Sequence, residues 1–367
     1  MWFMNGKNDL ESSALMDINQ LELAGSNGKI NIVVQLGRMK GQEGDDSSDG
    51  DWTGVRRYFI TRDTDTGRIN SPVVADLGKR DMGSWKELSE FIVWVKNNYP
   101  AERYALMMWD HGNGWKPIDE NNWPDFNKGF SLDEETGKEI SLPQLSRALK
   151  SSGNVDFILL DGCNMAMASV AYELKDRARV LVASEETEPG VVIRYSQIIS
   201  KASEKKLSPE ELGYYTVAFY RDYFEKMEGD NEGAPATQSA LRLYKMDELR
   251  RLADEWVMEA FSAEPQVLSL ATKEAKIFGE DPDYKDLCDF VSIISAGTHR
   301  PSLKSASDRL LRFIKNELVI YNWAQDYKSY GLSIYVPSLK YEPKYSSLSF
   351  SRDGLWDEFA SFLARQR

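Results

Sequence analysis

The stretch YALMMWDHGNGW, residues 104–115, opens with six apolar or aromatic residues and turns polar just before His111. A second stretch, VDFILLDGCNMA at residues 155–166, makes the same change just before Cys163. Short apolar runs without alternation are typical of strands that are buried on both faces, as in parallel sheets. These two stretches predict an α/β fold, and they raise the question of whether their polar endings form one site.

Helices and strands alternate on either side of these stretches. Strands separated by helices indicate a largely parallel sheet that is covered on both faces. Apolar residues at helical spacing, bounded by start and stop signals, predict the helices. Besides the two runs quoted above, the expected strands are 30–36, 56–62, 179–184, 236–243 and 331–336; the expected helices are 8–25, 84–99, 141–153, 166–176 and 207–227; 113–139 is a polar connection, and 245–323 is mostly helical.

Two of the expected helix starts carry specific signals. Asn8 and Glu11 have the spacing of a capping box, in which two side chains bind the first free backbone amides of a helix. Ser141 and Gln144 start another helix, which Gly153 is expected to stop. These signals predict where the helices begin and end.

The composition narrows the classes of protein that the chain can represent. A net charge of -13 over 367 residues disfavours a nucleic-acid partner and suits cationic substrates. No run approaches the roughly 18 apolar residues of a membrane span. Two cysteines cannot build a disulfide framework, and residues 1–11 lack the pattern of a secretion signal. A cytoplasmic location and an exported protein whose signal has been removed both stay open.

The two polar endings suggest a thiol–imidazole site. Ligands of open parallel sheets bind outside the carboxyl ends of strands, and His111 and Cys163 follow two such ends. An imidazole beside a thiol can take up its proton and later return it to a leaving amine. The backbone N–H groups of Gly112 and Cys163 can stabilise an oxyanion, and Asp161 adds a negative charge where an Arg or Lys side chain can dock.

Plainer interpretations of these residues stay open. A single cysteine in an apolar stretch is usually a small buried side chain, and a single histidine is usually structural. We interpret the other pair, Cys288 and His299, as structural, because the first lies on an amphipathic helical face and the second in a turn. The four residues lack the close spacing of a zinc site, so no metal site is expected from them.

The histidine segment YPAERYALMMWDHGNGW and the cysteine segment FILLDGCNMAMASVAYEL resemble those of the clostripain family of cysteine peptidases, whose fold is like that of caspases. LVASEETEPG and GLSIYVP also match family landmarks, and residues 1–22 look like the opening strand and helix. The resemblance implies that His111 and Cys163 form a catalytic dyad, with the N–H groups of Gly112 and Cys163 as the oxyanion hole. It also implies that Asp161 lies in the S1 pocket and favours Arg or Lys at P1.

The resemblance implies less about other residues. Glu185, Glu186 and Glu188 add acidity to the pocket or belong to a solvated loop. Family members often cut themselves after the histidine, and Lys128 is the expected point here, although an exposed lysine needs no such role. Gly162 and Asn164 depart from the common family pattern, as does VVIRY at 191–195, which puts the shape of the pocket in doubt.

Cofactor needs follow from the same resemblance. No organic cofactor is required. Some relatives depend on calcium, and the acidic loop at 41–52 supplies hard oxygen ligands, but their spacing does not follow a calcium-loop template. Calcium therefore stays open, beside a solvated acidic loop. The carboxylates in question are Asp45, Asp46, Asp49 and Asp51.

Together these observations predict a caspase-like, three-layer αβα sandwich with a mostly parallel central sheet. Residues 1–235 form the catalytic core, and 236–367 form a mainly helical C-terminal portion whose strands add to it. The expected activity is cleavage of peptides and proteins after Arg or Lys by a monomer that is secreted or in the cell envelope, through a dyad with no evident third residue. The alternatives are a catalytically silent binding protein on the same fold and another cysteine-dependent acyl-transfer enzyme, such as an amidase or transpeptidase.

Overall fold

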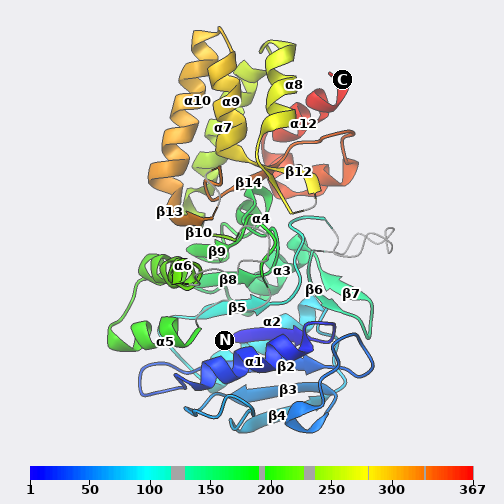
Figure 1. Ribbon diagram of the computed structural model, residues 1–367, viewed down its shortest axis with the longest axis vertical. Coiled ribbons are helices and arrows are strands. Elements are labelled where there is room, and N and C mark those ends of the chain that lie inside the picture. The colour runs from blue at the N-terminus through cyan, green and yellow to red at the C-terminus, as the bar shows by residue number, and fades with distance from the viewer. Residues whose placement is uncertain (117–128, 190–194, 227–235, 280, 326–327, 367) are drawn as a thin grey trace.

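The structure is a computed structural model that describes residues 1–116, 129–189, 195–226, 236–279, 281–325 and 328–366 (Figure 1). Within this part of the chain, nine strands form one sheet in the order β13-β10-β9-β8-β5-β1-β2-β3-β4. The strands are β1 (Trp2–Gly6), β2 (Val33–Arg38), β3 (Gly54–Phe59), β4 (Val73–Gly78), β5 (Ala105–Trp109), β8 (Phe157–Asp161), β9 (Val180–Ala183), β10 (Thr237–Arg242) and β13 (Val319–Ala324).

The centre of this sheet is parallel and its margins are antiparallel. Five central strands pair in parallel with one another, in the order β2, β1, β5, β8 and β9. On one side β3 and β4 continue the sheet antiparallel, and on the other side β10 and β13 do so. The prediction of a mostly parallel central sheet is therefore confirmed for the middle of the molecule.

Helices cover both faces of the sheet, which gives three layers. Along β5, Leu106 and Met108 join the apolar cluster on one face, and Met107 and Trp109 join the cluster on the other. This alternation explains the continuous apolar run, since both faces are buried. The first face is covered by α2 (Trp85–Asn98), α3 (Leu142–Ser152) and α4 (Ala168–Glu173), and the second by α1 (Glu11–Glu22), α5 (Tyr195–Glu204) and α6 (Pro209–Lys226).

The C-terminal part of the chain is mainly helical and lies at one end of the long axis (Figure 1). Its helices are α7 (Met246–Ala260), α8 (Pro265–Glu274), α9 (Leu287–Gly297), α10 (Pro301–Phe313), α11 (Ser349–Asp353) and α12 (Trp356–Arg365). Strands β10 and β13 come from this part and extend the central sheet. The predicted boundary at residue 235 lies outside the described residues, and the division into 1–235 and 236–367 stays a prediction.

Two small sheets occupy stretches that the sequence did not identify as strands. Strands β6 (Phe130–Asp133) and β7 (Lys138–Ile140) form a hairpin within the expected polar connection. Strands β11 (Ile277–Phe278) and β12 (Asp281–Asp286) lie in the stretch expected to be mostly helical. They pair with each other, and β12 also pairs with β14 (Ser333–Tyr335), which lies in the expected strand 331–336. The β6–β7 hairpin was not predicted within the polar connection at 113–139, because short polar strands carry no apolar run.

Candidate active site

The histidine and the cysteine lie at the same edge of the sheet. Strands β5 and β8 are parallel neighbours in which Trp109 pairs with Asp161. His111 and Cys163 each follow two residues later, so both emerge beyond the carboxyl ends of adjacent strands. The pairing continues for one step past the strands, because the Asp110 N–H donates to the Asp161 carbonyl at 3.2 Å. His111 and Cys163 therefore lie beyond the same edge of the sheet, on neighbouring strands, as the two polar endings suggested.

Two glycines allow the histidine loop and the cysteine loop to touch. A Cβ atom on Gly112 would lie 2.9 Å from the Cys163 carbonyl oxygen, and one on Gly162 would lie 2.5 Å from the Asp110 carbonyl oxygen. Neither distance is one that a real Cβ tolerates. No hydrogen bond among the described residues engages the N–H of Gly112, which is buried.

The buried carboxyl group of Asp110 binds the backbone of the histidine loop. Asp110 is 3% exposed, and its Oδ1 accepts from the His111 N–H and from Asn8 Nδ2, both at 2.7 Å. Its Oδ2 accepts from Asn5 Nδ2 at 2.9 Å. Burial raises the pKa of Asp110 well above its usual range. Asp110 therefore fixes the backbone of the loop through these hydrogen bonds.

The β6–β7 hairpin closes over the histidine loop. Gly112 and Phe130 form an antiparallel bridge, flanked by a hydrogen bond from the Ser131 N–H to the His111 carbonyl at 3.3 Å. The chain segment that follows the expected self-cleavage point is thus part of the wall of the site.

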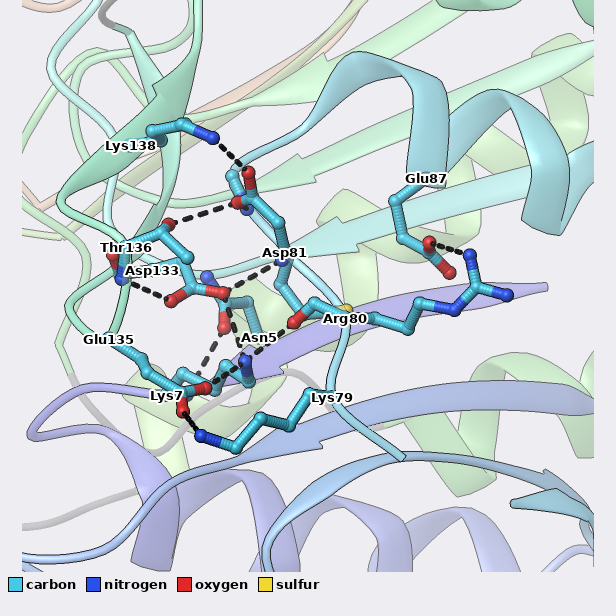
Figure 2. A network of polar contacts seen from close by, with 12 residues as sticks. Asn5, Lys7, Lys79, Arg80, Asp81, Glu87, Asp133, Glu135, Thr136 and Lys138 are labelled. Carbon is cyan, nitrogen blue, oxygen red and sulfur yellow. Dashed lines mark hydrogen bonds and ion pairs between the residues drawn. The ribbon is translucent and has the colours of Figure 1, made fainter. Parts of the chain in front are cut away.

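A buried lysine ties this hairpin to the end of β1 (Figure 2). Lys7 is fully buried, and its Nζ donates to the Arg80 carbonyl at 2.6 Å. It also lies 2.7 Å from Glu135 Oε2 and 3.2 Å from Asp133 Oδ2. Asp133 in turn accepts from the Met82 N–H at 2.8 Å. A buried charge of this kind is stable only when paired, and here the pairing joins three separate loops.

The thiol of Cys163 is not activated in this structure. Its Sγ accepts from the Glu188 N–H at 3.3 Å, and no hydrogen bond among the described residues joins it to the His111 ring. Burial raises the pKa of Cys163 to about 11, and the nearby charges of Glu188 and Asp161 act in the same direction. The resting cysteine is therefore a neutral thiol at pH 7.

Carboxyl groups with tyrosine partners lie beside the thiol. The Tyr195 hydroxyl donates to Asp161, and the Tyr220 hydroxyl donates to Glu188 Oε2 at 2.7 Å. Burial raises the pKa of Asp161 to about 6. Burial, followed by the charge of Asp161, raises the pKa of Glu188 well above its usual range. No cation lies among the described groups that shape the pKa values of Asp161 and Glu188.

Asp17 on α1 joins this carboxyl cluster, and sequence reasoning missed it. It accepts from Trp109 Nε1 at 2.8 Å. Burial, and then the charge of Asp161, raises its pKa well above the usual range. The only signal in the sequence was a carboxylate between the apolar residues Leu15 and Ile18 on one helix. Such a position is unusual for an acid, because burial of its charge is costly.

Of the three glutamates in the expected acidic loop, the structure brings only Glu188 to the thiol. Glu185 accepts from the Ser329 hydroxyl and interacts with Asp286, so it faces the C-terminal part of the chain. Glu186 Oε1 accepts from the Gly279 N–H at 2.6 Å. Both are buried and hold the cysteine side of the sheet to the C-terminal part. The alternative of a solvated loop fails for both.

The remaining predicted residues lie elsewhere. Lys128 is outside the described residues. Cys288 is buried in the first turn of α9, and His299 lies at the surface, where its N–H donates to Glu264 at 3.0 Å. Neither approaches His111 or Cys163 through any contact that the described residues make. The structural interpretation of this second pair fits these positions.

Calcium dependence stays a prediction. The described residues contain no group of three or more acidic, histidine or cysteine side chains arranged to hold a metal ion. In the acidic loop, Asp45 accepts from the Gly41 N–H at 2.8 Å, and Asp51 lies 2.6 Å from Lys40 Nζ. These carboxylates are engaged with the loop itself.

Comparison with known sequences gives a consistent picture. The sequence profile of the clostripain family matches residues 2–362, almost the whole chain. The chain is 26% identical to clostripain of Hathewaya histolytica over 219 residues, which are 55% of this chain and 41% of that protein. The chain therefore aligns with less than half the length of this relative.

Solved structures share the fold over nearly the full length. An inactive zymogen C11 protease from Parabacteroides distasonis has a TM-score of 0.70 at 19% identity, with 96% of both chains covered. A secreted C11 cysteine protease from Bacteroides thetaiotaomicron, called iotapain, has a TM-score of 0.72 at 16% identity, covering 96% of this chain and 97% of that one. At such identities the likeness concerns the fold alone.

Proposed function

This chain belongs to the clostripain family of cysteine peptidases, and on that premise we propose that it hydrolyses peptide bonds after Arg or Lys. One observation carries the proposal: the Cys163 thiol lies between an imidazole loop and a cluster of carboxyl groups at a single edge of the sheet. The imidazole side supplies proton transfer, and the carboxyl side supplies a place for a basic P1 side chain. We take the substrates to be peptides and proteins, and the working unit to be a monomer.

The proposed reaction uses His111 and Cys163. As the thiol sulfur forms a bond to the carbonyl carbon, its proton passes to the imidazole, which acts as general base. The N–H groups of Gly112 and Cys163 stabilise the oxyanion that forms. The bond from carbon to nitrogen then breaks, and the amine leaves with the proton from His111. Water, activated by the same imidazole, hydrolyses the thioester and restores the thiol.

The raised pKa of Cys163 bears on when the thiol loses its proton during the reaction. A pKa of about 11 leaves almost no thiolate at pH 7. Proton transfer to His111 therefore accompanies attack on a bound substrate and does not precede it. A basic P1 side chain beside Asp161 also offsets the carboxylate charges that disfavour the thiolate. On this view substrate binding assists the activation of the nucleophile.

Self-cleavage at Lys128 is part of the proposal. It is supported by the positions of the two other lysines in the same segment, which are paired within the fold and are therefore less suitable cleavage points. Lys116 Nζ lies 2.6 Å from Asp281 and 3.1 Å from Asp283, and it is mostly buried. Lys138 lies in β7 and pairs with Asp81 at 2.8 Å. Of the three lysines between residues 113 and 139, these two are therefore engaged in the fold.

The place of action is a further proposal. We propose export to the cell surface or beyond, because a structurally similar protease is described as secreted. In the described part of the chain, every helix is too short or too polar to cross a lipid bilayer.

The test uses short fluorogenic peptides that carry Arg, Lys, Asp or Leu at P1. We expect wild-type protein to cleave after Arg or Lys and Cys163→Ala to be inactive, with Cys288→Ala as the matched cysteine control. Equal turnover by wild type and Cys163→Ala would eliminate the mechanism. A silent binding protein would leave Cys163 unlabelled by a basic chloromethyl ketone, and an amidase or transpeptidase would be labelled without cutting proteins.

A further inference from the structure

Three neighbouring strands, not two, contribute to this edge of the sheet. Strand β1 pairs in parallel with β5, with Met4 opposite Trp109, on the side away from β8. Asp9 comes three residues after Gly6, the last residue of β1, and so lies beyond the same edge of the sheet. His111 therefore lies between Asp9 on one side and Cys163 on the other, in the strand order β1-β5-β8.

The contact between Asp9 and His111 is direct. Asp9 Oδ1 lies 2.7 Å from His111 Nε2, within ordinary hydrogen-bond distance. The two side chains are 46% and 28% exposed, so neither is locked in the core. A carboxylate can only accept a hydrogen bond, so the ring proton in this contact sits on Nε2. The other ring nitrogen, Nδ1, is then the one left for the thiol and the leaving amine.

The backbone around Asp9 is held by the histidine loop itself. Asn8, which is fully buried, donates from Nδ2 to Asp110 Oδ1 at 2.7 Å and to the Leu132 carbonyl at 2.9 Å. Its Oδ1 accepts from the Leu10 N–H at 3.0 Å. Asp110 Oδ1 also accepts from the His111 N–H. The residues on both sides of Asp9 are thus fixed, and one of them is tied to the oxygen that holds the backbone of His111.

We propose that Asp9 is the positioning residue of this site, which orients the His111 ring and directs its Nδ1 to the chemistry at Cys163. The proposal deepens the proposed function and rests on it. When the thiol proton passes to Nδ1, the ring becomes positively charged, and the Asp9 carboxylate beside Nε2 stabilises that charge without taking the proton. The site then works as a chain of three residues, in which Asp9 never touches the substrate.

The competing explanation for an effect of Asp9 is that any negative charge near His111 would have the same effect, without a direct contact to the ring. Glu134 on the hairpin is also close enough to interact with the histidine: burial and then the charge of Asp9 raise the pKa of Glu134, and the charge of His111 opposes this rise. It is an exposed residue, and no hydrogen bond among the described residues joins it to the ring. Glu134→Gln therefore removes a nearby charge without removing the contact, which makes it the matched control for Asp9.

The first measurement is steady-state kinetics on an Arg or Lys peptide. We expect Asp9→Ala to lower kcat on the order of 10- to 100-fold with KM within about twofold, because a misplaced general base loses rate and not binding. Asp9→Asn keeps an acceptor for Nε2–H and should retain more of kcat. Without the carboxylate an imidazolium is less stable, so Asp9→Asn should move the acidic limb of the kcat/KM profile to lower pH. Glu134→Gln should leave kcat within about twofold.

The second measurement needs no substrate. The chain has only two histidines, so ring N–H protons are readily assigned with a His299→Gln variant. We expect an N–H resonance of His111, protected from exchange with water, in wild type and Glu134→Gln, and its loss in Asp9→Ala. An unchanged kcat in Asp9→Ala, an equal loss in Glu134→Gln, or a resonance that survives in Asp9→Ala would each overturn the proposal. If wild type cut no basic peptide, the proposed specificity would fall, while the resonance would still decide the role of Asp9.

Discussion

The two halves of the active site are prepared to different degrees. On the imidazole half, His111 already has a carboxylate partner, a bridging hairpin and a buried carboxyl under its backbone. On the thiol half, the contacts of the described residues give Cys163 one weak hydrogen bond and a pKa raised to about 11, and no described cation pairs with the carboxyl groups around it. Among the described residues, the imidazole half is therefore the more completely assembled of the two.

This difference indicates which half depends on substrate. A basic P1 side chain would bring Asp161 and Glu188 a positive charge that no described residue supplies, and it would at the same time make the thiolate less unfavourable. Specificity and activation would then be two effects of one binding event. The imidazole half needs no such partner, so changes there should affect rate and not choice of substrate. Four predictions test this division.

Asp161→Asn should have the largest effect. We expect kcat/KM for peptides with Arg or Lys at P1 to fall roughly 10²- to 10³-fold, because a desolvated cation loses its charged partner. Turnover of a Leu peptide, slow in wild type, should not fall, which provides the control. Fluorogenic assays on both peptides check this. An equal fall in kcat/KM for both peptides would mean that Asp161 serves catalysis in general. The proposed division of roles between the two halves of the site would then be wrong.

Gly112→Ala should have the next largest effect. The new Cβ would lie 2.9 Å from the Cys163 carbonyl oxygen and 3.0 Å from Met165 Sδ, so the two loops must separate. We expect kcat/KM to fall about 10- to 100-fold on every substrate, with a loss of about 1–3 kcal/mol in the free energy of unfolding. Gly28→Ala, where a Cβ would meet nothing within 4 Å, is the matched control. Full activity in Gly112→Ala would show that contact between the loops is not required.

Alkylation of Cys163 should report the effect of a cation directly. In a Cys288→Ala background, we expect the rate with iodoacetamide to keep rising above pH 9, since the thiol pKa is about 11. Ethylguanidine, which fits a carboxylate pocket, should speed alkylation at pH 8 by up to roughly tenfold, equivalent to one pKa unit. Ethylurea, its neutral counterpart, should have no effect. Slower labelling with ethylguanidine would contradict substrate-assisted activation.

The smallest effect concerns a buried carboxyl pair away from the thiol. Burial raises the pKa of Asp286 to about 7, and Glu185 beside it is also raised. A raised carboxyl pKa favours the folded state at low pH, and this contribution is lost as the pH rises from about 4 to 7. Asp286→Asn keeps the helix cap to the Asp289 N–H but loses, at every pH, the acceptor of the Tyr330 N–H. We therefore expect the stability of the variant relative to wild type to be about 1 kcal/mol higher at pH 8 than at pH 4.

Urea unfolding of wild type and Asp286→Asn at the two pH values checks this prediction. A stability difference between variant and wild type that was the same at both pH values would mean that the pKa of Asp286 is not raised in the fold. In that case raised carboxyl pKa values would not be evidence of a missing cation on the thiol half either.

The sequence predicted best those strands that are buried on both faces of the sheet. The runs that became β5 and β8 are apolar on both faces, so their strand character was evident. The Ser141 capping box with Gln144 is present, and Gly153 ends that helix at a φ of 86°. The family resemblance, carried by the histidine and cysteine segments, is confirmed by the match to residues 2–362.

The failures have a common physical origin in long-range contacts. Asn8 and Glu11 form no capping box, because Asn8 binds Asp110, 102 residues away, and Glu11 pairs with the buried Arg38. Asp9 carried no signal of its own for the same reason, since its partner His111 is also 102 residues away. Local spacing describes what a side chain can do near its own backbone. It does not reveal a distant partner that competes for the same oxygen.

The two facing glycines have a consequence for control of this protein. Each loop carries a glycine into whose missing side chain the other loop's carbonyl fits, at Gly112 and at Gly162. Any movement of one loop past the other would break both contacts. A switch between idle and working forms that kept these contacts would operate through side-chain rotation or through the short segment at 187–189, where Glu188 supplies the amide beside the sulfur.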